Sequence, residues 1–392
     1  MFWRSLFSRP ILWIFTLLGF AFNVLLLNAI SSTVAPSLLI DHESGPAVDH
    51  IAFWAAGWLA NHGDAAAAYD PAALAAVQSA GLGYDYLGVM PWFYPPLAQV
   101  LAQPFAYLSP AWSLIVWGAL GLSIFTYAAW RILPDPLAVL MAVTFSAFAV
   151  LYNGQIGLFI AAIAGLCLLS YRRSGGGGGW LALLMLKLQT VFAIPLAMAF
   201  SGCWRPIVTA CLAGAVLIAV SAAWLGVDVW LTFIGAFTGT VDFFLVDPAR
   251  SDLWAKYASA YGVLLYNGAP IRAAGMAQAA VSLAVIAVAT ITLRRCGPTD
   301  AALAIIVYAA IIAAPRIFVY DLPLLAIGAL FHARASIKRG WAWWEVPMFA
   351  VGLVLMETAF ITAPQAAVLI APAFLAATYL RHIDETTISR CN

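Results

Sequence analysis

Residues 11–30 read ILWIFTLLGFAFNVLLLNAI, and no charged side chain occurs between Arg9 and Asp41. A helix that crosses a bilayer needs about 20 mostly apolar residues. This run is longer than the apolar core of a typical signal peptide, and no clear small-x-small cleavage site follows it. We therefore predict an uncleaved membrane-spanning helix at this position.

The same pattern extends along the 392-residue chain. No charged residue lies between Asp85 and Arg131 or between Asp135 and Arg172. Hydrophobic residues make up 64% of the chain and charged residues 9%, with a mean hydropathy of +0.95, whereas soluble proteins are about 45–50% apolar and about 25% charged. The net charge of +1 also argues against a nucleic-acid partner. The composition predicts an all-α polytopic membrane protein without a separate soluble domain.

Positive residues indicate the orientation, because they collect on the cytoplasmic side of a membrane. Arg4 and Arg9 precede the first span and Arg381 follows the last, so we expect both termini in the cytoplasm and the chain in the inner (plasma) membrane. Charge-free stretches of about 20 residues then give about 12 spans. They are expected at about residues 11–30, 111–131, 135–151, 156–171, 174–204 (crossed twice by short helices, or entered and left on one side), 206–225, 275–294, 299–315, 319–335, 343–361 and 364–381.

Two long external loops are expected, at 31–110 and 226–272, within a single transmembrane domain of residues 1–392. Residues 31–91 carry six acids and no Lys or Arg. Asp70 followed by Pro71 is a typical helix start, which predicts a short helix over about 71–80. Residues 92–108 read WFYPPLAQVLAQPFAYL, and three prolines interrupt this short segment. We interpret it as a membrane-surface or re-entrant helix.

The predicted topology places polar residues together on the external face: Asp49, Gln155, Lys187, Arg316 and Asp321. Each also has a structural explanation. Asp49 is a possible N-cap, and Gln155 follows an Asn-Gly turn. The Lys187 side chain can reach the interface as a snorkelling lysine, and Arg316 with Asp321 can form a pair that closes a loop.

A carboxylate beside cations at a membrane surface suits one kind of chemistry. The carboxylate accepts a proton from an attacking hydroxyl, and the cations bind a lipid-linked phosphate and stabilise it as it leaves. The five histidines form no HExxH or similar pattern. The sequence therefore predicts neither a metal nor another cofactor, and a metal held by His42 and His50, which share the loop of Asp49, is the alternative.

Six short motifs follow one another in an order that resembles glycosyltransferase family 87, polytopic enzymes of the GT-C superfamily. They are Asp49-x-x-x-Phe53-x-x-Ala56-x-x-Leu59, Tyr69-Asp70-Pro71, WFYPPL at 92–97, Gly154-Gln155, Lys187-x-Gln189 followed by Pro195, and PRIFVYDLPLL at 315–325. The resemblance implies a GT-C fold, in which the first external loop holds juxtamembrane helices and the catalytic carboxylate.

It also implies an inverting hexosyltransferase, with mannose moved from a polyprenyl-phosphate donor to a glycan or glycolipid acceptor outside the cytoplasmic membrane. Carried onto this chain, the general base is Asp49. Lys187 and Arg316 are expected to bind the donor phosphate. Further substrate contacts are expected from Tyr94, Gln155, Gln189, Tyr320 and Asp321. A transporter or flippase of a lipid-linked sugar intermediate is the alternative, because the same cations would bind a lipid phosphate.

Overall fold

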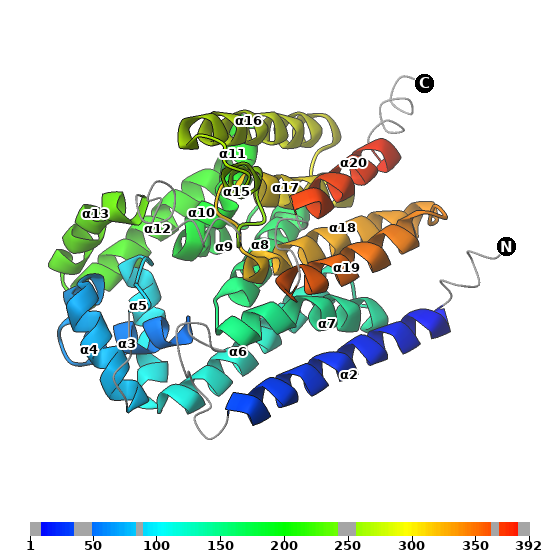
Figure 1. The fold of residues 1–392 in the computed structure, drawn as a ribbon. Helices are drawn as coiled ribbons and strands as arrows, with labels where there is room; N and C mark the ends of the chain where they lie inside the picture. Colours follow the sequence, from blue (N-terminus) through cyan, green and yellow to red (C-terminus); the bar gives the residue numbers. More distant parts are fainter. Residues whose placement is uncertain (1–8, 35–48, 84–88, 242–255, 362–367, 383–392) are drawn as a thin grey trace.

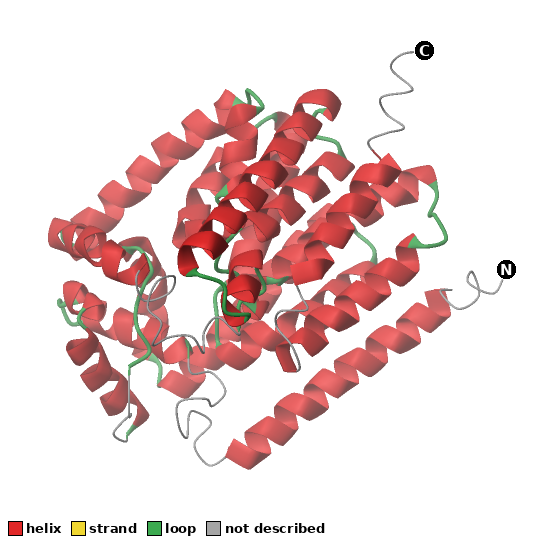
Figure 2. Cartoon of the chain, turned by 45° about the horizontal axis from the view of Figure 1, so that its top comes forward, coloured by secondary structure: helices red, strands yellow, loops and turns green. Residues whose placement is uncertain are grey.

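The computed structural model describes residues 9–34, 49–83, 89–241, 256–361 and 368–382. Throughout these residues the regular elements are helices joined by loops (Figure 2). One isolated antiparallel bridge pairs Tyr257 with Phe318. The predicted all-α class is confirmed. Arg4, and the loop acids Asp41 and Glu43, lie outside the described residues.

The long helices lie close to the predicted spans (Figure 1). They are α2 (Arg9–Val34), α6 (Pro110–Ile132), α7 (Pro136–Asn153), α8 (Gly157–Ser174), α12 (Trp204–Leu225), α16 (Ile271–Cys296), α17 (Asp300–Ala313), α18 (Pro323–Arg339), α19 (Glu345–Ile361) and α20 (Ile370–His382).

Five helices in the described part, α6, α7, α8, α12 and α16, are long and apolar enough to cross a membrane. The segment around Lys187 is broken into α9 (Gly178–Leu183), η3 (Leu184–Lys187), α10 (Leu188–Val191) and α11 (Ala193–Phe200). Its two halves meet at an angle of 111°, and counted as one broken span they raise the number to six. The chain is therefore a polytopic helical membrane protein, although length and composition support fewer spans than the predicted 12.

Short helices fill the first predicted loop: α3 (His50–Asn61), η1 (Ala65–Tyr69), α4 (Pro71–Leu82), α5 (Pro96–Ala102) and η2 (Gln103–Tyr107). The Asp70 carboxylate accepts a hydrogen bond from Ala72 N at 2.8 Å and caps α4, as predicted. Helix α3 packs against the other four, and they form one group beside α12 and α13 (Val227–Val241) in Figure 1. The second predicted loop contains α13 and α15 (Ala260–Tyr266).

Helix α8 crosses the centre of the bundle and separates two polar clusters. Its C-terminal end carries Arg172, which lies 3.2 Å from the buried carboxylate of Asp300, and Arg334 and Lys338 of α18 reach the same carboxylate. Gln155 lies just before its N-terminal end. A helix of 18 residues rises about 26 Å. Three of the basic residues that the charge rule groups together, Arg172, Arg334 and Lys338, therefore meet at the end of the bundle opposite Gln155.

Candidate active site

Asp49 occupies the N-cap position of α3, but its side chain makes no capping hydrogen bond. Its Oδ2 instead accepts a hydrogen bond from Gln155 Nε2 at 2.6 Å. Gly154 makes this approach possible. Its φ is +67°, and a Cβ at this position would lie 2.4 Å from the Cβ of His50. Asp49 is therefore more than a helix cap, and Gln155 is more than the end of a turn.

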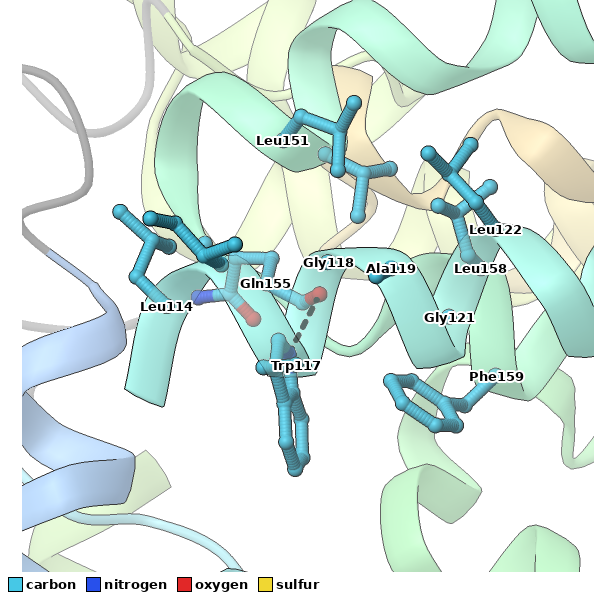
Figure 3. Close-up of a pocket in the computed structure, with 13 residues that line it drawn as sticks. Leu114, Trp117, Gly118, Ala119, Gly121, Leu122, Leu151, Gln155, Leu158 and Phe159 are labelled. Carbon is cyan, nitrogen blue, oxygen red and sulfur yellow. Dashed lines mark hydrogen bonds between the residues drawn. The ribbon is translucent and has the colours of Figure 1, made fainter. Parts of the chain in front are cut away.

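Both ends of the Gln155 amide are held. Its Oε1 accepts a hydrogen bond from the Tyr94 hydroxyl at 2.9 Å. Its backbone oxygen accepts one from Trp117 Nε1 at 3.3 Å (Figure 3). The Tyr69 hydroxyl donates to the backbone oxygen of Tyr94 at 2.8 Å. These contacts orient the amide nitrogen of Gln155 toward Asp49, and they connect three separate motifs of the sequence.

Aromatic rings pack behind this network. The Phe53 ring lies 5.4 Å from that of Trp92, 4.8 Å from that of Tyr94 and 5.0 Å from that of Trp117. Next to Asp49, His50 is buried and shares a hydrogen bond of 2.9 Å with Ser113 Oγ of α6. Burial lowers the pKa of His50 to about 4, so this imidazole is neutral at pH 7 and fixes the start of α3 on α6.

Lys187 and Asp321 form a buried ion pair. Lys187 Nζ lies 2.6 Å from Asp321 Oδ1, with side-chain exposures of 7% and 1%. The ammonium group also lies 4.8 Å from the centre of the Tyr320 ring, and Phe318 N donates to Asp321 Oδ2 at 3.2 Å. Lys187 does not snorkel to the interface, and its carboxylate partner is the one that the sequence suggested for Arg316.

Glycine allows the segment that carries this pair to approach α8. A Cβ on Gly157, at the start of α8, would lie 1.9 Å from the carbonyl oxygen of Tyr320. Only glycine fits without a shift of the backbone, since backbone atoms cannot move aside as a flexible side chain can. The segments around residues 155 and 320, far apart in sequence, are in this way brought together.

Electrostatic effects connect the network of Asp49 and Gln155 with the segment that carries Arg316 and the Lys187–Asp321 pair, and these residues together form the Asp49 cluster. Burial is the largest effect on Asp49 and raises its pKa, while the Gln155 hydrogen bond and the charges of Lys187 and Lys256 act in the opposite direction. Burial lowers the pKa of Arg316, whereas Tyr257, Tyr320, Tyr94 and Asp321 favour its charged form. Asp49 is therefore a carboxylate with an enhanced affinity for a proton, surrounded by cations.

The structure thus places all but one of the predicted site residues in one cluster. The exception is Gln189 of α10, which is half-buried and has no hydrogen bond or ion pair to the cluster in the described part of the chain. Lys256 is the residue that sequence reasoning missed. It is exposed and precedes Tyr257, whose bridge to Phe318 ties it to the segment of Arg316. The signal in the sequence that could have identified Lys256 is its position as a cation in the acid-rich second loop.

Two further features complete the surroundings of the cluster. Among the described residues, no group of three or more His, Cys, Asp or Glu side chains is arranged to hold a metal ion. A cavity of about 320 Å³ borders Gln155 and lies between α6 and the junction of α7 with α8 (Figure 3). Its walls are almost entirely apolar.

Comparison with known proteins identifies the family. The profile described as Glycosyltransferase family 87 matches residues 92–318, a range that includes Tyr94, Gln155, Lys187 and Arg316 and ends before Tyr320. No curated protein and no solved structure matches the chain. The family implies a membrane glycosyltransferase, which acts on a sugar donor and an acceptor in a bilayer. Because the matched range covers more than half of the sequence, this chain belongs to glycosyltransferase family 87.

Proposed function

We propose that this protein transfers a hexose, mannose, from a polyprenyl-phosphate donor to a hydroxyl group of a glycan or glycolipid, with Asp49 as the general base. One observation carries the proposal. The Asp49 carboxylate is held by a side-chain amide at 2.6 Å instead of capping its helix, and cations lie near it. A positioned carboxylate of raised proton affinity is what general-base catalysis needs.

The proposed reaction is a single displacement. Asp49 takes the proton from the acceptor hydroxyl, the oxygen attacks the anomeric carbon, and the bond from that carbon to the phosphate oxygen breaks. Polyprenyl phosphate leaves with an additional negative charge. Arg316, Lys187 and Lys256 stabilise this charge. Proton removal by a general base, here Asp49, contributes about 10²–10⁴-fold to the rate.

The engagement of Asp321 supports inversion at the anomeric carbon. Retention through a covalent intermediate requires a second, nucleophilic carboxylate. Both oxygens of Asp321 are occupied, Oδ1 by Lys187 and Oδ2 by the backbone NH of Phe318. Asp49 is then left as the base for one direct displacement.

The two polar clusters at opposite ends of α8 support the proposed orientation. Basic residues gather around Asp300 at one end, and this end is proposed to face the cytoplasm, as the positive-inside rule requires. The Asp49 cluster then lies at the external or periplasmic boundary of the plasma membrane, with both termini inside and about 12 short and long helices crossing the bilayer. A site at this boundary serves a donor whose lipid tail is soluble only in the bilayer and whose sugar is soluble only in water.

Proteoliposomes containing the purified protein test the proposal. They are supplied with radiolabelled polyprenyl-phosphate mannose and a membrane lipid extract as acceptor, and in parallel with a nucleotide-linked mannose. We expect label in a new glycosylated product only from the lipid-linked donor, with the anomeric configuration inverted. Failure to consume any polyprenyl-phosphate sugar, across several sugars and acceptors, would overturn the proposal.

A further inference from the structure

A larger cavity lies at the other end of the bundle, between α2 and the helices α7, α18 and α19. Its volume is about 600 Å³ and most of its walls are apolar. Along α18 its lining runs from Ala326 to Ile337, a rise of about 16 Å. The proposed transfer reaction uses none of the residues that line it. The principal ones are Leu12, Leu137, Met141, Leu330, Ile337 and Phe349.

The cavity is a wedge that forms where α2 separates from its neighbours. In the middle of α2 the helix packs closely on α7 (Figure 1): Asn23 Nδ2 donates to the backbone oxygen of Thr144 at 2.8 Å. A Cβ on Gly19 would lie 2.9 Å from the ring of Phe145. About two turns before Gly19, however, Leu12 lines the cavity instead. An apolar space is thus left between the first turns of α2 and the rest of the bundle.

The cavity is accessible from outside the bundle near the start of α2. Ile337, Trp341 and Trp343 line it and are exposed, by 53%, 41% and 68%. Tryptophan side chains gather where the hydrocarbon of a membrane meets water. A membrane lipid therefore fits here with its hydrocarbon in the cavity and its head group at this boundary.

Buried hydrogen bonds fix the segment that carries the two tryptophans. The Glu345 carboxylate accepts hydrogen bonds from Ala342 N and from Ser336 Oγ. Arg381 lies 4.0 Å from the same carboxylate, balances its charge and donates to the backbone oxygen of Gly340. The mouth of the cavity is therefore ordered before a ligand arrives, so binding costs little conformational entropy.

Cations outnumber carboxylates around this mouth. Arg9 lines the cavity and pairs with Asp135 at 2.7 Å, and Asp135 also serves as the N-cap of α7. The guanidinium of arginine has several N–H donors, of which the pair with Asp135 uses one. On the adjoining face of α18, one buried carboxylate, that of Asp300, is shared by three cations: Arg172, Arg334 and Lys338. Basic pockets between membrane helices on the cytoplasmic side attract anionic head groups.

We propose that this cavity binds an anionic diacyl phospholipid, with its acyl chains between α2 and α18 and its phosphate at Arg9. The inference goes beyond the proposed function and takes from it only the orientation, which places the lipid in the cytoplasmic leaflet. The bound hydrocarbon supplies packing contacts that the walls of an empty wedge would lack, and it thereby joins the first turns of α2 to the bundle. The donor of the proposed reaction does not suit this cavity, because α8, with a rise of about 26 Å, separates this end of the bundle from the Asp49 cluster.

Photolabelling tests where the lipid binds. The probe is a phosphatidylglycerol with a diazirine in one acyl chain, present at low density in proteoliposomes, and labelled peptides are identified by mass spectrometry. We expect adducts within residues 136–142 and 323–339. Ala329→Trp fills the cavity and should suppress them, whereas Ala215→Trp adds the same ring at an exposed position of α12 that does not line the cavity. Adducts that persist unchanged in Ala329→Trp, or that spread evenly over the exposed helices, would overturn the inference.

Competition between lipids tests the part played by charge. The purified protein is mixed with phosphatidylglycerol and phosphatidylcholine, and native mass spectrometry gives the ratio in which the two are retained. We expect a clear preference for phosphatidylglycerol, which Arg9→Gln lowers about fivefold, the effect of one Lys or Arg near an anionic head group. Arg205→Gln removes an exposed cation from the start of α12 and should leave the ratio unchanged.

The remaining outcomes separate other occupants from this one. Equal retention of the two lipids by the wild type would show that the cavity holds bilayer hydrocarbon without regard to charge, and would refute the anionic assignment. Displacement of phosphatidylglycerol by an equal amount of polyprenyl phosphate would assign the cavity to a substrate lipid instead. Neither measurement requires turnover, so a protein without transferase activity would contradict the proposed function and leave this test intact.

Discussion

Replacement of Asp49 by Asn removes the candidate base with almost no change in shape. An amide cannot accept the proton of the acceptor hydroxyl, so the variant loses the contribution of general-base catalysis, about 10²–10⁴-fold in kcat. This corresponds to about 2.7–5.5 kcal/mol of activation free energy. The amide oxygen of Asn can still accept the hydrogen bond from Gln155, so the geometry around the base is retained.

The folded protein should tolerate this substitution well. Burial raises the pKa of Asp49 in the folded state, so the folded chain holds the proton more tightly than the unfolded chain does. Its contribution to stability therefore falls as the pH rises through the unfolded and then the folded pKa. At a pH above the ordinary pKa of an aspartate, the raised pKa of Asp49 therefore costs folding free energy, and neutral Asn removes that cost. We expect a Tm equal to or above that of the wild type.

The assay compares initial rates of mannose transfer in proteoliposomes for the wild type, Asp49→Asn and Asp70→Asn. Asp70 lies in the same loop and caps α4, and Asn caps a helix as well as Asp does, so Asp70→Asn is a matched control that should keep full activity. Equal rates for the wild type and Asp49→Asn would refute the assignment of the base. A large loss in Asp70→Asn would show that the loop as a whole, and not one carboxylate, determines the rate.

Other changes around the cluster have distinct outcomes. Gln155→Leu removes a hydrogen bond worth about 1.5–3 kcal/mol, so kcat/KM should fall about tenfold or more. The acid limb of its pH–rate profile should also move to higher pH, because the Gln155 hydrogen bond lowers the pKa of Asp49. Lys256→Gln should move the limb in the same direction and raise the donor KM, with an unchanged Tm because the side chain is exposed. Gly157→Ala should lower the free energy of unfolding by about 1–3 kcal/mol, since its Cβ would lie 1.9 Å from the carbonyl oxygen of Tyr320. Gly179→Ala is the control and should leave the free energy of unfolding unchanged, because no atom lies within 4 Å of its Cβ. Thermal unfolding of the two variants measures both effects.

Local features of the fold could be predicted from the sequence. The Asp70-Pro71 pair marked the start of α4, and the prolines of 92–108 limited that segment to two short helices. Long charge-free runs located most of the long helices. These features depend on neighbouring residues and on the contrast between lipid and water, and both are visible along a single chain.

The pairing of distant side chains was not visible in the same way. Lys187 and Asp321 are 134 residues apart, and Gln155 and Asp49 are 106 residues apart. A membrane helix is apolar on its lipid-facing side and on its protein-facing side alike, so hydrophobic periodicity does not show which face meets which neighbour. The sequence suggested Arg316 as the partner of Asp321 because the two lie in one loop, and the bend of the chain near Lys187 was not visible, although it places the lysine 2.6 Å from Asp321.

In the proposed reaction, the charge changes give a reason for a carboxylate and several cations to lie together. Asp49 and Asp321 lie within the electrostatic reach of Lys187, Lys256 and Arg316, and the proposed donor brings the single negative charge of a phosphodiester to them. During transfer the leaving phosphate approaches a charge of about −2, while Asp49 gains a proton and becomes neutral. The total charge of the proposed site is therefore the same before and after the reaction, and no additional charge develops in a partly desolvated cavity, where it would be costly. The buried Lys187–Asp321 pair is compatible with this constant total charge. It supplies a fixed dipole beside Tyr320 without adding net charge, so the proton on Asp49 and the charge on the phosphate are free to change together.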